Sequence, residues 1–194
     1  MNPNAISAFE YVTILISIIL GLGITQVLSS IAEYIHHSKK VTFYYPHSIW
    51  VAIILFMHIQ EWFVIYELKG YPVWKLPTFL FIILYPIALF IITKLLFPIK
   101  LTDNELDLKE YYLNNFPKIF YLFSICILLS VIFNLYFLKT ILWQQLLLLI
   151  PGCLFLYFAK QKIKQDKMHK ALSIFILLLI IITTIAEQNA WYVK

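Results

Sequence analysis

Residues 48–68 read SIWVAIILFMHIQEWFVIYEL, an apolar run interrupted by only two charged residues, Glu61 and Glu67. A helix needs about 20 such residues to cross a bilayer. Comparable runs lie on both sides of this one along the chain. We therefore predict six membrane spans, at residues 8–31, 48–68, 77–99, 118–138, 141–160 and 170–191. A five-span arrangement, with one run lying in the membrane interface, is the main alternative.

The composition supports the same class. The chain has 194 residues, of which 62% are hydrophobic and 13% charged, whereas soluble domains average roughly 45–50% apolar and about 25% charged residues. A soluble protein of this size lacks the interior to bury so much apolar surface. We expect an all-α polytopic transmembrane helical bundle in the plasma (inner) membrane, with residues 1–194 forming a single membrane domain and no separate soluble catalytic domain.

The positive charges predict the orientation. All 15 cationic residues are lysines, which argues against sites built on a bidentate guanidinium group. Eleven of them lie in or beside the first, third and fifth connections between spans, and four lie on the other side. Because cytoplasmic loops are enriched in positive residues, we expect both termini to face outward (N-out, C-out). The net charge of +5 then reflects topology, and we expect no nucleic-acid partner.

The third connection is the longest. Thr102 and Glu105 have the spacing of a helix capping box, and Leu108, Tyr112 and Phe116 follow at intervals of four residues. We interpret residues 103–116 as a short helix lying on the cytoplasmic interface, with a solvated loop as the alternative.

Polar residues at membrane depth are the main functional signal, because an ionisable group in a bilayer is costly unless it is paired or hydrated. His58 and Glu61 are three residues apart and are expected to share a helix face, and Gln60 lies between them. Such a pair can relay a proton, bind a cation or hold a metal. It can also form a buried hydrogen bond that holds two helices together.

Alternating span directions place the other polar groups at the same end of the bundle. Each lies close to the outer end of its span: Glu10, Asn134, Gln144 with its neighbour Gln145, Glu187 and Gln188. The inner half consists almost entirely of leucine, isoleucine and phenylalanine. We therefore predict one polar cavity in the non-cytoplasmic half, with His58 and Glu61 as its deepest members.

The first span carries a stripe of small residues at intervals of four. Small residues let helix backbones approach closely, so Ser17, Gly21, Thr25 and Ser29 predict a packing seam within the protomer or between subunits. A pore-lining stripe is the alternative.

These features favour a protein that handles protons, cations or a small polar solute. The alternatives are a non-catalytic sensor or assembly subunit, and a membrane-embedded enzyme acting on a lipid or a quinone. The sequence holds no phosphate-binding loop and no zinc-ligand spacing, so we expect no cofactor and no metal. The expected partners are the lipid bilayer and either further copies of this chain or another membrane subunit.

Overall fold

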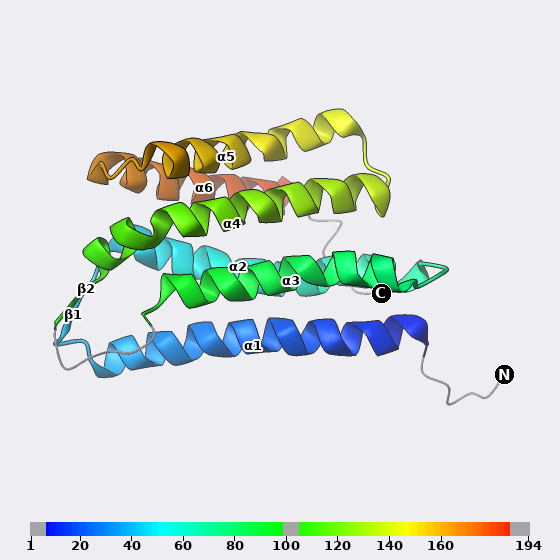
Figure 1. Cartoon of the computed structure of the whole chain (residues 1–194), viewed down its shortest axis with the longest axis horizontal. Helices are drawn as coiled ribbons and strands as arrows, with labels where there is room; N and C mark the ends of the chain where they lie inside the picture. The colour runs from blue at the N-terminus through cyan, green and yellow to red at the C-terminus, as the bar shows by residue number, and fades with distance from the viewer. Residues whose placement is uncertain (1–6, 99–104, 187–194) are drawn as a thin grey trace.

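The computed structural model describes residues 7–98 and 105–186, and of Gln144 the backbone alone. Within these ranges six long helices run back and forth along the longest axis of the molecule (Figure 1). They are α1 (Ala8–His36), α2 (Tyr45–Tyr66), α3 (Leu76–Leu96), α4 (Leu108–Tyr136), α5 (Leu142–Gln161) and α6 (Asp166–Ala186), and a short 3₁₀ helix, η1 (Glu67–Gly70), continues α2. The all-α fold class predicted from the sequence is confirmed.

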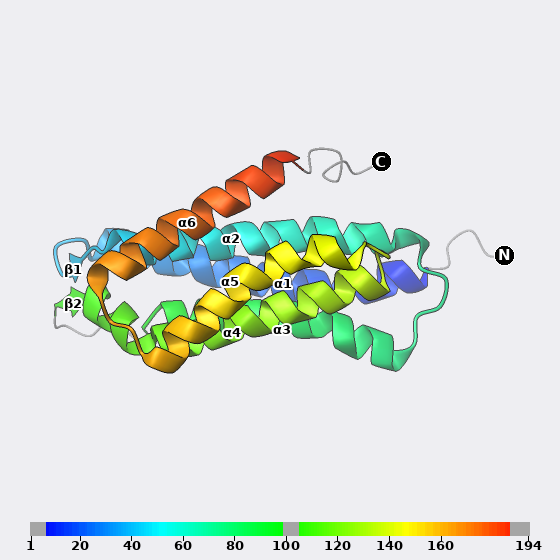
Figure 2. The same cartoon turned by 90° about the horizontal axis from the view of Figure 1, so that it is seen from above.

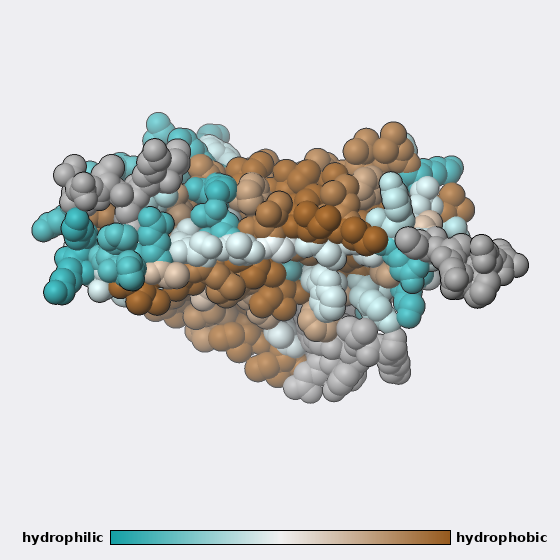
Figure 3. Space-filling view, turned by 90° about the horizontal axis from the view of Figure 1, so that it is seen from below, coloured by the Kyte–Doolittle hydropathy of each residue, from teal (hydrophilic) through white to brown (hydrophobic). Residues whose placement is uncertain are grey.

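Five of these helices are long and apolar enough to cross a membrane: α1, α2 together with η1, α3, α4 and α6. The apolar part of α5, Gln145–Gln161, is shorter. On the face shown in Figure 3, hydrophobic residues form most of the middle, and hydrophilic residues gather towards the two ends. This distribution is that of a multi-pass membrane protein.

Successive connections lie at opposite ends of the bundle (Figure 1). The connections between α1 and α2, α3 and α4, and α5 and α6 share one end, which we call the lysine-rich end. There β1 (Val41–Thr42) pairs in parallel with β2 (Leu106–Asp107), with Val41 opposite Leu106. This two-stranded ladder ties the first connection to the third.

The third connection differs from the sequence prediction. Thr102 lies outside the described residues, and the side chain of Asp107 caps α4 by accepting hydrogen bonds from the backbone N–H groups of Lys109 and Glu110. From Leu108, α4 runs to Tyr136 without a break. Within the described residues, the interfacial helix predicted at 103–116 is therefore not a separate element. Its apolar stripe is buried because these residues form the first turns of a core helix.

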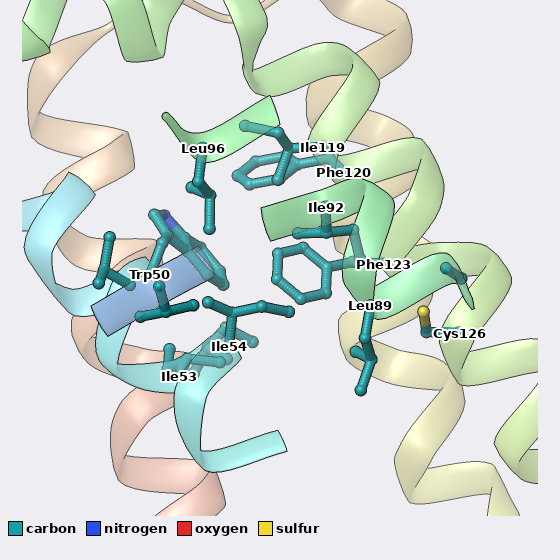
Figure 4. Packing of buried hydrophobic residues seen from close by; sticks show 14 of the residues in the cluster. Trp50, Ile53, Ile54, Leu89, Ile92, Leu96, Ile119, Phe120, Phe123 and Cys126 are labelled. Carbon is teal, nitrogen blue, oxygen red and sulfur yellow. The ribbon is translucent and has the colours of Figure 1, made fainter. Parts of the chain in front are cut away.

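Buried apolar side chains pack the centre of the bundle. Figure 4 shows Trp50 and Ile54 of α2 facing Leu89 and Ile92 of α3 and Phe123 of α4. On its outer sides, α5 packs along α4, and α6 packs against α2. Seen from above, the far end of α6 stands away from the other helices (Figure 2).

A chain of hydrogen bonds crosses the bundle near the lysine-rich end. The carbonyl oxygen of Ile163 can only accept, so Nε2–H of His169 donates to it at 2.6 Å. Nδ1 of His169 then accepts from the hydroxyl of Tyr112 at 2.9 Å, and that hydroxyl accepts from Nε1–H of Trp50 at 3.0 Å. All three side chains are buried. The chain joins α2, α4 and α6 with every donor matched to an acceptor.

The small-residue stripe of α1 is not a packing seam within the protomer. Ser17, Gly21, Thr25 and Ser29 are all exposed. The buried face of α1 lies beside this stripe and consists of Val12, Ile16, Leu20, Gly23, Val27, Ser30 and Tyr34. Burial of the larger apolar side chains against α2 and α3 determines which face of α1 points inward, and it leaves the small polar residues outside.

Candidate functional site

A cavity of about 900 Å³ lies towards the end of the bundle opposite the lysine-rich end. It is formed by the second half of α2, the first half of α3, the second half of α4 and the start of α5, and Thr183 near the end of α6 also borders it. Polar side chains are numerous in its lining: Gln60, Glu61, Glu67, Tyr85, Ser130, Asn134, Thr140, Gln145 and Thr183.

Glu61 is the most deeply placed carboxylate of this lining. Its residue is only 9% exposed, and it borders the cavity beside Tyr85 of α3. Among the described residues it forms no hydrogen bond and no ion pair. A carboxylate without a protein partner at membrane depth is costly unless it is hydrated or binds a ligand. The open space beside Glu61 offers room for either.

The rim of the cavity between α4 and α5 is built from amide and hydroxyl groups. Nδ2 of Asn134 donates to Oε1 of Gln145 at 3.0 Å, and Nε2 of Gln145 donates to Oγ1 of Thr140 at 2.9 Å. The backbone N–H of Thr140 in turn donates to the carbonyl of Asn134 at 3.2 Å. This ring of bonds closes the tight turn from α4 to α5, where Lys139 adopts a left-handed backbone conformation with φ of 54°.

His58 lies away from the cavity. It is fully buried, and its Nδ1–H donates to the carbonyl oxygen of Ile54 at 2.7 Å. Its Nε2 has no hydrogen-bond partner among the described residues and points at Gly23 of α1, where an added Cβ would lie 2.0 Å from it. The expected pairing of His58 with Glu61 is therefore not formed. Residues three apart on a helix differ by about 60° in direction, which is enough for one to face α1 and the other the cavity.

Glu10 also lies outside the cavity. It is exposed at the start of α1, where its Oε2 accepts a hydrogen bond from the backbone N–H of Ser7 at 2.8 Å. Its backbone N–H donates to Oγ of Ser7, which completes a capping box. Glu10 therefore caps the helix and takes no part in the candidate site.

Four of the residues singled out in the sequence come together at this cavity: Gln60, Glu61, Asn134 and Gln145. Glu187 and Gln188 lie outside the described residues, and the side chain of Gln144 does too. The structure adds Glu67, Tyr85, Ser130, Thr140 and Thr183 to the lining. Helix spacing indicates that Ser130 shares a face with Asn134, but nothing in the sequence identifies Tyr85.

The described residues contain no group of three or more histidine, cysteine, aspartate or glutamate side chains that could hold a metal ion. The cavity offers one buried carboxylate, Glu61, and one exposed carboxylate, Glu67, among neutral hydrogen-bonding groups. Such a site can accept a proton, attract a cation or bind a polar solute through donors and acceptors.

No protein-family model, no curated protein and no solved structure matches this chain.

Proposed function

We propose that this chain is an integral plasma-membrane protein that binds and transfers a proton, a cation or a small polar solute through the cavity beside Glu61. The observation that carries the proposal is the placement of Glu61. It is a buried carboxylate without a described protein partner, and it borders a cavity of about 900 Å³.

The size and lining of the cavity support a hydrated ion or a small solute as the bound species. Ligand pockets typically enclose about 300–1,000 Å³, so this volume exceeds what a bare ion needs. The amides of Gln60, Asn134 and Gln145 and the hydroxyls of Ser130 and Thr183 offer neutral donors and acceptors that replace lost water contacts. The negative charge of Glu61 favours a cation among these species.

The proposed direction of access follows from the lysines. The positive-inside rule places the lysine-rich end in the cytoplasm, so the cavity lies in the non-cytoplasmic half of the membrane. The described residues of one protomer form a pocket towards one end of the bundle, and we propose that conduction across the membrane requires a homo-oligomer. The exposed stripe of Ser17, Gly21, Thr25 and Ser29 is the surface on α1 that permits the closest approach of a second helix.

The placement of Glu61 also argues against a purely structural role. Polar groups that serve only to hold helices together are expected to bond to one another across the helix interface. Asn134 and Gln145 do so, whereas Glu61 does not bond to any described group.

The proposal is tested in proteoliposomes by measuring the flux of protons, Na⁺ and K⁺ with trapped indicators. The native chain is compared with Glu61→Gln, which removes the charge and keeps the shape. The matched control is Glu10→Gln, the same change in a residue towards the same end of the bundle but outside the cavity. We expect flux above that of empty liposomes for the native chain and for Glu10→Gln, and its loss for Glu61→Gln. Background flux of all three ions in the native chain contradicts the transfer of protons and of these cations, and equal flux in both variants contradicts the role of Glu61.

A further inference from the structure

A second cavity, of about 710 Å³, lies near the lysine-rich end, between α1, α3 and α4. It is separate from the cavity beside Glu61 and shares no lining residue with it. Two lysines border it, Lys94 from the last turn of α3 and Lys118 from α4. No acidic residue is among the described residues that line it.

The charges of these two lysines are not neutralised within the described part of the chain. Nζ of Lys94 donates to Oε1 of Gln26, a neutral acceptor that fixes the position of the ammonium group. Lys118 is exposed and forms no hydrogen bond or ion pair with a described residue. The pocket therefore has two positive charges and, among the residues that the structure describes, no counter-ion.

Two other lysines at the same end form ion pairs with one aspartate. Nζ of Lys109 lies 3.3 Å from one carboxylate oxygen of Asp166, and Nζ of Lys170 lies 2.7 Å from the other. The uncompensated charge at Lys94 and Lys118 is therefore not shared by every lysine at this end.

The polar walls of the pocket are held in place by hydrogen bonds to the backbone. The hydroxyl of Tyr111 donates to the carbonyl of Leu95 at 3.1 Å, which joins α4 to the end of α3. Nδ2 of Asn115 donates one hydrogen to the carbonyl of Tyr111 at 3.0 Å. The amide group has a second N–H, which is available to a ligand in the pocket.

The depth of the pocket indicates the source of its ligand. Lys94 lies two residues before the end of α3, and Lys118 stands at the start of the apolar run of α4. Both therefore lie where the apolar part of the bundle meets its polar end, which is the level of lipid phosphate groups. The apolar side chains of Leu95 and Phe97 border the same space.

We propose that this pocket binds the phosphate group of an anionic membrane lipid, with Lys94 and Lys118 as its cationic contacts and Asn115 as a neutral donor. Basic pockets between helices on the cytoplasmic side of a membrane are suited to such headgroups. The acyl chains of a lipid whose phosphate group is bound here would lie along the neighbouring apolar helices. A free phosphate ion has no acyl chains and lacks this apolar contact.

The test uses the full chain in nanodiscs made of equal parts of phosphatidylglycerol and phosphatidylcholine. Lipids that stay bound after transfer to detergent are counted by native mass spectrometry, and the affinity for fluorescent phosphatidylglycerol is measured in the same detergent. The double variant Lys94→Gln/Lys118→Gln is compared with Lys160→Gln/Lys167→Gln. The control pair removes the same charge from exposed lysines at the same end that line neither cavity.

We expect the native chain and the control pair to retain phosphatidylglycerol in preference to phosphatidylcholine, and the pocket variant to bind it about tenfold more weakly or worse. Equal weakening in both double variants would mean that general surface charge explains the binding, and this result overturns the proposal. Absence of any preference in the native chain overturns it as well. Inorganic phosphate is added as a competitor in a separate arm, and displacement of the lipid by phosphate at comparable concentration rules out the membrane as the source of the ligand. Circular dichroism of each variant checks that its helices are intact.

Discussion

The imidazole of His58 occupies the space that a side chain at Gly23 would need. A Cβ atom at Gly23 would lie 2.0 Å from Nε2 and 2.5 Å from Cδ2 of His58. Both residues are buried, so the contact fixes how closely α1 and α2 approach. His58, the most conspicuous intramembrane histidine of the sequence, therefore packs one helix against another, and Glu61 alone of the expected pair faces the cavity.

Gly23→Ala is expected to destabilise the protein by about 1–3 kcal/mol, because the added methyl group overpacks the contact with His58. The measurement is thermal unfolding in detergent. Gly21→Ala is the matched control on the same helix, where an added Cβ meets nothing within 4 Å. It is expected to be neutral or stabilising by up to about 1 kcal/mol, since alanine favours helices over glycine. Equal destabilisation by the two substitutions would contradict the close contact.

Tyr112→Phe is expected to cost about 1–3 kcal/mol of stability, because it leaves the buried Nε1–H of Trp50 and Nδ1 of His169 without partners. Tyr111→Phe, the same change one residue earlier, removes a single bond from a partly buried hydroxyl to the carbonyl of Leu95. Its expected cost is smaller, about 1 kcal/mol or less. Denaturant or thermal unfolding of both variants checks this order, and a Tyr111 variant less stable than the Tyr112 variant would refute it.

Single cysteines in the connections test the proposed orientation. Ser38→Cys lies in the connection between α1 and α2, and Val73→Cys in the connection between η1 and α3, and both positions are exposed. We expect a membrane-impermeant thiol reagent added to intact cells to modify Val73→Cys, and to modify Ser38→Cys only after the membrane is opened. The opposite pattern would invert the orientation. Modification of both from the same side would show that α2 does not cross the membrane.

The helices were predictable because a long apolar run has few possible structures other than a membrane-spanning helix, and because lysines are concentrated in the connections. The helix ends were less predictable. The run from Leu108 to Phe116 is amphipathic, and a pattern of period four looks the same whether its apolar face lies on a membrane interface or in a protein core. In the structure, Tyr112 and Phe116 are buried, and α4 continues through Pro117.

The candidate site was predictable in depth but not in direction. Alternating spans place Glu61 and Asn134 at one end of the bundle whatever the packing, and both line the cavity. The direction in which a side chain points depends on the rotation of its helix about the helix axis. That rotation depends on how all the buried side chains of the core pack together. The sequence alone therefore did not show that His58 and Glu61 point in different directions. It also did not show that the small-residue stripe of α1 lies outside the buried face of that helix.

The proposed function requires that the space beside Glu61 hold water and open away from the lysine-rich end. Two positions on α4 test it most directly: Ser130 lines the cavity, and Ile132 is exposed on the outer surface of the same helix. The native chain has two free cysteines of its own, Cys126, which is buried, and Cys153, which is exposed. The labelling rate of the native chain is therefore the baseline. The measurement is the rate at which a charged, membrane-impermeant thiosulfonate, added from the non-cytoplasmic side, modifies Ser130→Cys and Ile132→Cys. We expect fast modification of Ser130→Cys and baseline labelling of Ile132→Cys. Baseline labelling of Ser130→Cys in a folded protein would contradict this expectation.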